Sequence, residues 1–358
     1  MSITYGLNLK LDIYGGSHDE KIGMTLDGIP AGEVIDMDAL RAFMARRAPG
    51  RDAYSTSRRE DDEPVFLSGL DGNVTNGERI EAVIYNKNQR SGDYSSLSDT
   101  PRPSHADFAA RMKYGESVDL RGGGHFSGRL TAPMCIAGNI CLQILARRGI
   151  SIGAHIYSVG GIMDDAFDPV SVCGKDFDIV HSRTFPALNE ERGEEMKAEI
   201  ERARLDLDSI GGIVECAAIG LPAGLGEHMF GSVEGAVSGI VFGIPAVKGI
   251  EFGAGFRSSK MRGSENNDPF MTDGKTIFTK TNNAGGILGG MTSGMPLIFR
   301  AAIKPTPSIA REQDTVSLSR MENTRITVGG RHDPCIIPRA VPVFEAACAI
   351  ALLDLMEG

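Results

Sequence analysis

The segment Pro342-Val-Phe-Glu-Ala-Ala-Cys-Ala-Ile-Ala-Leu-Leu-Asp-Leu-Met356 is apolar around almost its whole helical circumference. This pattern predicts a helix that is packed on most of its sides, with Pro342 in the first turn, where proline is tolerated. Residues 134–148 have the same character and predict a second buried helix. Two such helices need layers of other elements around them.

Shorter patterns of both kinds surround these helices. Asp36 or Asp38 can cap a helix that ends at Arg47, and residues 191–207 show the charge-rich pattern of a surface helix. Because runs with β character lie between the helices without a strict βαβ order, the sequence predicts an α+β fold with antiparallel pairing. The predicted strands cover residues 6–14, 21–26, 64–70, 79–85, 150–159, 212–221, 246–256, 296–303 and 325–328.

Two long polar segments interrupt this pattern. Residues 86–104 and 257–276 are rich in Ser, Asp, Asn and Gly, which predicts mobile loops that could act as lids over a site rather than as linkers. We therefore expect residues 1–358 to form a single domain.

Charge and cysteine usage limit the partners. The chain has 37 Lys and Arg against 47 Asp and Glu, a net charge of −10, which argues against nucleic acid or an anionic membrane as the main partner. No apolar run reaches the roughly 18–20 uninterrupted residues that a bilayer requires, and the first residues show no signal-peptide pattern. The six cysteines have neither C-x-x-C nor zinc-site spacing. These features predict a cytoplasmic protein with reduced thiols and no metal site.

Basic and glycine-rich clusters are the strongest functional signals in this acidic chain. The Walker, GxGxxG, GxSxG and HExxH patterns are all missing. Six arginines within residues 41–59 favour binding of a polyanion, although a solvated helix face with a basic loop would give the same pattern. Residues 121–129, 282–290 and 304–308 contain glycines, hydroxyls and cations suited to a phosphate, or they are ordinary connections. The six arginines are Arg41, Arg46, Arg47, Arg51, Arg58 and Arg59.

Three histidines lie in polar, turn-rich surroundings, where an imidazole can transfer protons near neutral pH. They are His18 in Gly-Gly-Ser-His-Asp, His105 in Arg-Pro-Ser-His-Ala-Asp and His332 in Gly-Arg-His-Asp-Pro-Cys. Their spacing alone does not establish that they meet at one site.

Taken together, these ordered motifs resemble the chorismate synthase family from about Gly15 to the last helix. The resemblance rests on Gly15-Gly-Ser-His18, Arg46-Arg-Ala-Pro-Gly50, Ser57-Arg-Arg-Glu60, Arg102-Pro-Ser-His-Ala-Asp107, Arg121-Gly-Gly-Gly124, Asn283-Ala-Gly-Gly-Ile-Leu-Gly-Gly290, Lys304-Pro-Thr306 and Gly330-Arg-His-Asp-Pro-Cys335. It implies a β-α-β sandwich with helices between antiparallel sheets, assembled as a homotetramer.

The resemblance also implies a reaction. Phosphate and a C6 hydrogen leave 5-enolpyruvylshikimate 3-phosphate by anti-1,4-elimination, which gives chorismate in the shikimate pathway of aromatic amino acid biosynthesis. Reduced FMN is required although the reaction involves no net redox change. The polyanionic substrate would explain the arginine cluster.

Site residues are transferred by motif position. The resemblance implies that His18 protonates the leaving phosphate, that His105 binds and protonates the reduced flavin near N1, and that Asp333 acts with flavin N5 in accepting the C6 hydrogen. Substrate contacts fall on Ser17, Arg46, Arg47 and Arg129, with Arg47 also at the position of an NADP contact. Flavin contacts fall on His125, Phe126, Ser127, Pro245, Ala246, Gly289, Lys304, Pro305, Thr306, Pro307, Ser308 and Arg331.

Several positions depart from the family pattern. Gly16 and Asp19 stand where the family has Glu and Gly, and an added carboxylate beside His18 would raise the pKa of that imidazole. Ala53 replaces an arginine associated with NADPH use, so we expect a monofunctional enzyme that depends on an external flavin reductase. Near the flavin, His125, Phe126 and Pro245 replace the usual Arg, small residue and Asn.

Three other readings of the sequence remain. A divergent paralogue could bind FMN without the elimination, and the altered flavin contacts favour it, whereas His18, His105 and Asp333 argue against it. A nucleic-acid-binding module is disfavoured by the low aromatic content and the negative charge. An oligomeric scaffold would leave the polar histidine clusters unexplained.

Overall fold

The structure is a computed structural model that describes residues 2–50, 62–86, 99–116, 118–329 and 332–358. The helices of this part are α1 Met37–Arg47, α2 Asp107–Tyr114, α3 Thr131–Arg147, α4 Gly174–Ser182, α5 Glu190–Leu205, α6 Val233–Val241, α7 Gly263–Asn266 and α8 Ile337–Met356, with 3-10 turns at Arg121–Phe126, Gly128–Leu130, Met229–Gly231 and Gly255–Lys260.

Two five-stranded antiparallel sheets form the outer frame of the core. The first has the order β1-β2-β3-β7-β4, with strands Ser2–Tyr5, Lys10–Tyr14, Lys21–Asp27, Ile80–Tyr85 and Val65–Ser68. The second has the order β11-β16-β10-β8-β9, with strands Val247–Phe252, Leu297–Ile303, Gly212–Ile219, Ser151–Val159 and Ile162–Met163. Four hairpin pairs complete the strands: β5–β6 (Leu70–Asp71, Val74–Thr75), β12–β13 (Phe270–Thr272, Ile277–Thr279), β14–β15 (Ile287–Leu288, Met291–Thr292) and β17–β18 (Gln313–Ser317, Glu322–Ile326).

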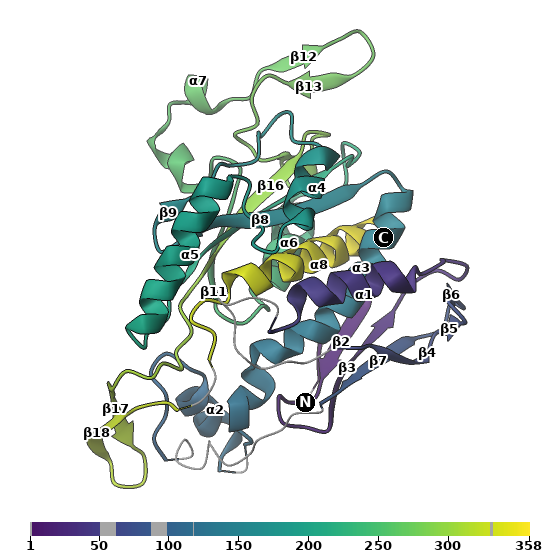
Figure 1. Cartoon of the computed structure of the whole chain (residues 1–358). Coiled ribbons are helices and arrows are strands. Elements are labelled where there is room, and N and C mark those ends of the chain that lie inside the picture. Colours follow the sequence, from purple (N-terminus) through teal and green to yellow (C-terminus); the bar gives the residue numbers. More distant parts are fainter. Residues whose placement is uncertain (1, 51–61, 87–98, 117, 330–331) are drawn as a thin grey trace.

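Helices α3 and α8 lie between the two sheets, as the resemblance implied (Figure 1). Helix α3 packs on β3 and β7 of the first sheet, and α8 packs on β8 and β10 of the second. The two helices cross at Gly138, where a Cβ atom would lie 2.2 Å from the Cβ of Ala346. Only glycine permits this approach, so the crossing depends on one residue.

The second sheet is covered on both faces. Cys216 and Phe299 belong to the main core around α8, whereas their strand neighbours Ala217 and Ile298 pack on the opposite face with Phe177 of α4. This alternation is what a strand with two buried faces requires. The layer order is therefore sheet, helices, sheet and an outer layer that contains α4 and α5 (Figure 1).

The structure corrects three sequence-based boundaries. The last helix begins at Ile337 instead of Pro342, because Pro338 occupies the first turn and Pro342 lies inside the helix. The predicted strand over residues 6–14 begins only at Lys10, because residues 6–9 form the turn between β1 and β2, with a φ of +101° at Gly6. Residues 257–276 contain part of a 3-10 turn, α7 and β12, so this segment has regular structure and its mobility stays a prediction.

The turn after Gly6 is fixed by the other end of the chain. The Asp354 carboxylate of α8 accepts hydrogen bonds from the backbone N–H groups of Leu7, Asn8 and Leu9 at 2.7–3.1 Å. This contact explains why the apolar pattern of residues 6–14 does not form one strand, since three of its N–H groups bind a side chain instead of a neighbouring strand.

Candidate active site

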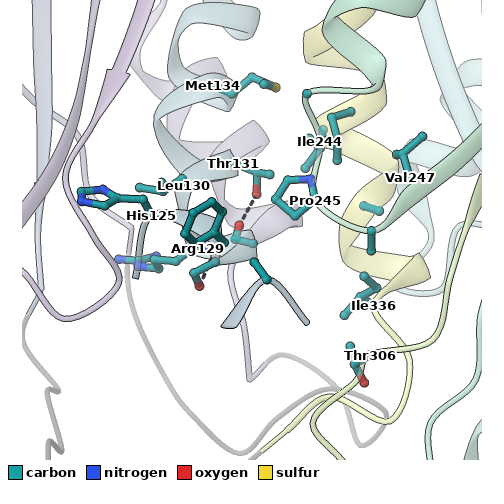
Figure 2. Close-up of a pocket in the computed structure, with 18 of the residues that line it drawn as sticks. His125, Arg129, Leu130, Thr131, Met134, Ile244, Pro245, Val247, Thr306 and Ile336 are labelled. Carbon is teal, nitrogen blue, oxygen red and sulfur yellow. Dashed lines mark hydrogen bonds between the residues drawn. The ribbon is translucent and has the colours of Figure 1, made fainter. Parts of the chain in front are cut away.

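A cavity of about 910 Å³ opens where the first sheet, the helical layer and the second sheet meet. Its walls come from β1 and β2, from residues 122–131 before and at the start of α3, from the end of α6 and from the start of α8. Figure 2 shows His125, Arg129, Leu130 and Thr131 on one side of the cavity and Pro245, Val247 and Ile336 on the other. The size suits a cofactor or a small-molecule substrate.

Positive charge dominates the cavity wall, although the chain carries a net charge of −10. Among the described residues that line it, Asp333 is the only carboxylate. A cavity of this composition in an acidic protein favours a ligand with several negative charges. The lining cations are Arg47, Arg102, Arg129, Lys248, Lys304 and Arg339.

Buried Asp62 holds two of these arginines in place. Arg47 Nη1 lies 2.8 Å from Asp62 Oδ2, and Arg129 pairs with Oδ1 of the same carboxylate. Arg47 also donates to the Gly128 carbonyl oxygen at 2.9 Å. Burial alone would raise the pKa of Asp62, but the two guanidinium groups outweigh it and hold the pKa below its usual value.

Arg339 at the start of α8 adds a third buried guanidinium. Its Nη1 donates to Asp333 Oδ2 at 2.5 Å and its Nε donates to the Arg47 carbonyl oxygen at 3.2 Å. Burial is the main cause that lowers the pKa of Arg339, and Arg47 and Arg129 add to it. Arg47 and Arg129 thus share Asp62, and Arg339 pairs with Asp333, so buried carboxylates hold all three guanidinium groups at the cavity wall.

A glycine arc lets the backbone form one wall. Gly122, Gly123 and Gly124 have φ values of +57°, +95° and +52°. A Cβ at Gly122 would lie 2.3 Å from His18 Cε1, and one at Gly124 would lie 2.1 Å from the Asp119 carbonyl oxygen. Side chains are therefore excluded from this arc, which brings main chain directly to the cavity.

His18 and Ser17 lie behind that arc, next to the cavity wall. The Ser17 hydroxyl donates to the Arg121 carbonyl oxygen at 3.0 Å and lies 3.1 Å from His18 Nδ1. Because the hydroxyl hydrogen is used on Arg121, Ser17 Oγ accepts from Nδ1, which places a hydrogen on that nitrogen.

His105 reaches the cavity from a loop that is held by one acidic neighbour, Asp107, and one basic neighbour, Arg102. Its Nδ1 lies 2.6 Å from Asp107 Oδ1, and Arg102 binds the same carboxylate through Nε at 2.7 Å and Nη2 at 2.8 Å. Burial would raise the pKa of Asp107, but hydrogen bonds from Arg102 and His105 hold it well below its usual value. His105 is thus part of a rigid ion-paired loop.

Residues 304–308 form the opposite wall. The Lys304 N–H donates to the Ala246 carbonyl oxygen at 2.9 Å, and Ala246 itself has a φ of +76°. The Ser308 hydroxyl accepts from Arg102 Nη1 at 3.1 Å. Burial, with neighbouring Lys248 adding to it, lowers the pKa of Lys304. The wall thus presents an ammonium group and hydroxyls, a set that suits a phosphate.

Most residues assigned by resemblance meet in this cavity. The lining includes Arg47, His105, His125, Phe126, Ser127, Arg129, Pro245, Ala246, Lys304, Thr306, Pro307, Ser308 and Asp333. Arg331 and Ala53 lie outside the described residues.

Five assigned residues do not line the cavity. Ser17 and His18 lie behind the glycine arc, and Pro305 is skipped between its lining neighbours. Arg46 turns toward the core, where both its terminal nitrogens bind Glu345 at 2.7 and 2.8 Å. Gly289 lies in the exposed turn between β14 and β15.

The three altered flavin positions have defined places. His125 Nδ1 donates to the Gly15 carbonyl oxygen at 2.7 Å, which joins the glycine arc to the segment before His18. The Phe126 ring lies 6.5 Å from the Tyr114 ring, centroid to centroid. Pro245 faces the cavity opposite Arg129 (Figure 2).

Sequence reasoning missed Asp62, Asp107, Lys248 and Arg339. Asp107 stands inside the motif that contains His105, so the motif itself could have revealed it. Asp62 follows four other acidic or basic residues of a charged run, and nothing in that run distinguishes Asp62 as a residue that becomes buried.

In the part of the chain that the structure describes, one apolar stretch, Gly128–Arg147, is long enough to cross a membrane by length and composition, but 78% of its most apolar window is buried inside the protein. It forms the start and body of α3, so it is a core helix of the fold.

Comparisons with known proteins agree with this site. The family model described as chorismate synthase matches residues 9–356. Proteins named chorismate synthase from Lancefieldella parvula and Dehalococcoides mccartyi are 42% and 44% identical, with 99% of this chain and 96% of each relative covered. A crystal structure of chorismate synthase matches with a TM-score of 0.78 and 27% identity, covering 98% of this chain and 92% of that one.

The fold and the cationic cavity define an α+β enzyme that acts on a small anionic molecule. The chain belongs to the chorismate synthase family. The expected lyase class and the sandwich of helices between antiparallel sheets are confirmed, and membership implies a flavin cofactor and a small-molecule substrate.

Proposed function

We propose that the cavity catalyses the anti-1,4-elimination of phosphate and a C6 hydrogen from 5-enolpyruvylshikimate 3-phosphate, which yields chorismate. The observation that carries this proposal is the set of six cations around a cavity of about 910 Å³ with a single lining carboxylate among the described residues. The substrate has one phosphate and two carboxylates, so its charge complements this wall.

The described residues fit FMN. The glycine arc offers main chain against a flat ring, and Lys304, Thr306 and Ser308 offer an ammonium and two hydroxyls for a phosphate. Ser127, Pro245 and Ala246 line the space between these walls. When bound in its reduced form, the flavin would supply electron density for loss of phosphate and take it back as the C6 hydrogen leaves. Pro307 and Arg331 remain proposed flavin contacts.

Substrate binding is assigned to the arginines. Arg47 and Arg129, fixed by Asp62, would hold the substrate anions, and Arg339 adds a cation that the family motifs did not indicate. Because Arg46 binds Glu345 with both terminal nitrogens, we propose that it supports the cavity through the core instead of contacting substrate. Arg47 remains the proposed NADP contact.

Proton transfer is assigned to two histidines and one carboxylate. His18, with the hydrogen on Nδ1 directed to Ser17, would donate a proton to the departing phosphate. His105 would protonate and bind the reduced flavin. Asp333, held by Arg339 at 2.5 Å, would act with the flavin in accepting the C6 hydrogen. Loss of phosphate from C3 and of hydrogen from C6 leaves the second ring double bond.

The cellular setting is part of the same proposal. We place the enzyme in the cytoplasm as a single domain, with reduced flavin supplied by a separate reductase and with no nucleic-acid or membrane partner. We also propose a homotetramer. Burial of the exposed Met229, Phe230 and Phe256 side chains against another copy would stabilise such an assembly. Light scattering of the purified protein would give the oligomer size.

Anaerobic turnover tests the reaction directly. Purified protein would receive 5-enolpyruvylshikimate 3-phosphate with chemically reduced FMN in one arm and with oxidised FMN plus NADPH in the other, and released phosphate and chorismate would be measured. We expect product in the first arm only. Product in both arms would contradict dependence on an external reductase, and folded, FMN-binding protein without product in either arm would favour the divergent paralogue.

A further inference from the structure

A buried carboxylate lies two residues after His105, at the first position of α2. Asp107 is 1% exposed, and its Oδ1 lies 2.6 Å from His105 Nδ1. The other ring nitrogen of His105 faces the glycine arc, since a Cβ at Gly123 would lie 3.4 Å from Nε2. One nitrogen of the imidazole therefore faces a carboxylate and the other faces the cavity wall.

Among the described residues, Arg102 makes three hydrogen bonds to Asp107, and the carboxylate accepts in each of them. Oδ1 accepts from Arg102 Nη2 at 2.8 Å, and Oδ2 accepts from Arg102 Nε at 2.7 Å and from the Arg102 backbone N–H at 3.0 Å. A carboxylate bound in this way is ionised. His105 Nδ1 must then carry a hydrogen in order to bind Oδ1. Arg102 Nη2 lies 3.1 Å from the same Nδ1, and this is a contact between two donors that converge on Oδ1.

We infer that Asp107 is a positioning residue for the reaction: it keeps the hydrogen of His105 on Nδ1 and directs Nε2 to the cavity. The inference rests on the proposed function for the part that His105 plays, but the position of the hydrogen is a property of the protein alone. A carboxylate that selects one imidazole tautomer is a general device of enzymes that move protons through histidine.

The surroundings keep Asp107 and His105 rigid. Arg102 links the pair to the opposite wall through its 3.1 Å hydrogen bond to Ser308. The β17–β18 hairpin holds the chain just before Arg102, because the Ser317 hydroxyl donates to Asp99 and the Thr315 hydroxyl donates to the Pro101 carbonyl oxygen. The imidazole is thus fixed from its carboxylate side, as accurate proton transfer requires.

Asp107→Asn tests the inference with almost no change in shape. The amide nitrogen cannot accept, so one orientation would set it against the Nε and the backbone N–H of Arg102, and the other would set it against Arg102 Nη2 and His105 Nδ1. The second orientation leaves one opposed donor, Arg102 Nη2, if the imidazole hydrogen moves to Nε2, so it is then the more favourable of the two. We therefore expect the variant to change the tautomer, which ¹⁵N-histidine NMR of the ligand-free protein reports, with the His105 signals identified from a His105→Gln sample.

Turnover gives the second readout. We expect kcat of Asp107→Asn to fall about 10²-fold, the scale of a misplaced proton-transfer group, whereas KM for substrate changes less than about threefold. The matched control is Asp164→Asn. Asp164 forms another buried carboxylate–imidazole contact, 3.1 Å from His155 Nδ1 and outside the cavity, so it should alter stability but neither the His105 signals nor kcat.

The outcomes separate this inference from the proposed function. An Asp107→Asn protein that keeps the Nδ1 hydrogen on His105 would overturn the inference, and so would a changed tautomer with normal kcat. If the unmodified protein converts no substrate, the proposed function fails while the NMR result still reports the tautomer. Should Asp107→Asn not fold, Asp107→Glu keeps the charge and must keep the Nδ1 hydrogen.

Discussion

At the scale of single residues, the cavity wall depends on buried carboxylates that fix cationic and imidazole groups. Asp62 binds Arg47 and Arg129, Asp107 binds His105, and Asp333 binds Arg339. Removing one member of such a pair leaves the other charge buried without a partner, which costs more than the pair itself contributes. Variants at the site therefore change folding as well as chemistry, and the two effects must be measured separately.

His105→Ala should reduce kcat by about 10²–10⁴-fold, because a positioned proton donor is lost. The far-ultraviolet circular dichroism spectrum should stay unchanged. His228→Ala is the matched control, since the His228 side chain is 73% exposed and pairs with its neighbour Glu227. Normal turnover in His105→Ala would remove this residue from the proposed chemistry.

Arg47→Ala should weaken substrate binding by about 1.5–3 kcal/mol, the scale of a charged hydrogen bond. It should also lower the free energy of unfolding by about 3–5 kcal/mol, because Asp62 loses a buried partner. Calorimetric titration and denaturant unfolding would measure these separately. The double variant Arg47→Ala/Asp62→Asn should regain part of the stability and none of the affinity; recovered affinity would show that Arg47 does not bind substrate.

At the scale of elements, the α3–α8 crossing places the start of both helices at the cavity. Arg129 and Thr131 precede or begin α3, and Asp333 and Arg339 precede or lie in the first turn of α8. A change in the distance between these helices therefore moves groups on two sides of the site. Gly138 controls that distance because it faces Ala346 with no side chain between them.

Gly138→Ala should destabilise the protein by about 1–3 kcal/mol through overpacking, although alanine favours a helix more than glycine does. A Cβ there would lie 2.2 Å from the Ala346 Cβ and 2.4 Å from its Cα. Gly193→Ala in α5 is the opposite case. Its nearest neighbour would be at 3.4 Å, so the change should stabilise by about 0.5–1 kcal/mol. Thermal unfolding of both variants checks the difference in sign.

At the scale of the whole molecule, Glu345 joins three layers. This buried carboxylate of α8 accepts from Arg46 of α1, from His181 of α4 at 3.0 Å and from the Ala154 backbone N–H of β8 at 3.1 Å. Burial would raise the pKa of Glu345, but Arg46 and His181 outweigh it and lower the pKa from 4.5 to about 2.

A carboxyl group whose pKa is lower in the folded than in the unfolded protein stabilises the folded state at any pH above the unfolded-state pKa. This contribution is lost as the pH falls toward the folded-state pKa. The shift of Glu345 from 4.5 to about 2 corresponds to about 3 kcal/mol. Glu345→Gln should therefore lower the free energy of unfolding by about 3–5 kcal/mol at pH 7 and flatten its pH dependence between these two values. Denaturant unfolding at a series of pH values measures this, and an unchanged slope would contradict the assignment.

The sequence predicted the layers well, because patterns of apolar residues follow directly from burial. The runs near residues 134–148 and 342–356 gave the two central helices, and most predicted strands lie within a few residues of those observed. The short helices α2, α4 and α6 were not predicted, since each buries only a few side chains and its pattern covers barely two turns. The turn that follows Gly6 could not be predicted from the local pattern, because it depends on hydrogen bonds to Asp354 far away in the sequence.

Site residues could be predicted only where they belong to a recognisable sequence motif. The histidines and the segments 121–129 and 304–308 were indicated by polar, glycine-rich sequence and by the family resemblance. The pairing of Asp62 with Arg47 and Arg129, and of Arg339 with Asp333, depends on tertiary contacts that no local pattern reports. Arg46 is the opposite case, because its motif predicted a substrate contact whereas its side chain forms an ion pair with buried Glu345 in the core.

The turn after Gly6 bears on how the chain is made. Its N–H groups bind Asp354, and the contact from Leu9 spans 345 positions of sequence. During synthesis, the ribosome releases residues 6–9 long before it adds residue 354, so the turn between the first two strands lacks this partner until the last helix has been made. We expect this edge of the first sheet to stay incompletely folded in the nascent chain. Contacts between residues so far apart in sequence also slow folding after release from the ribosome. The part made first is thereby among the last to be completed.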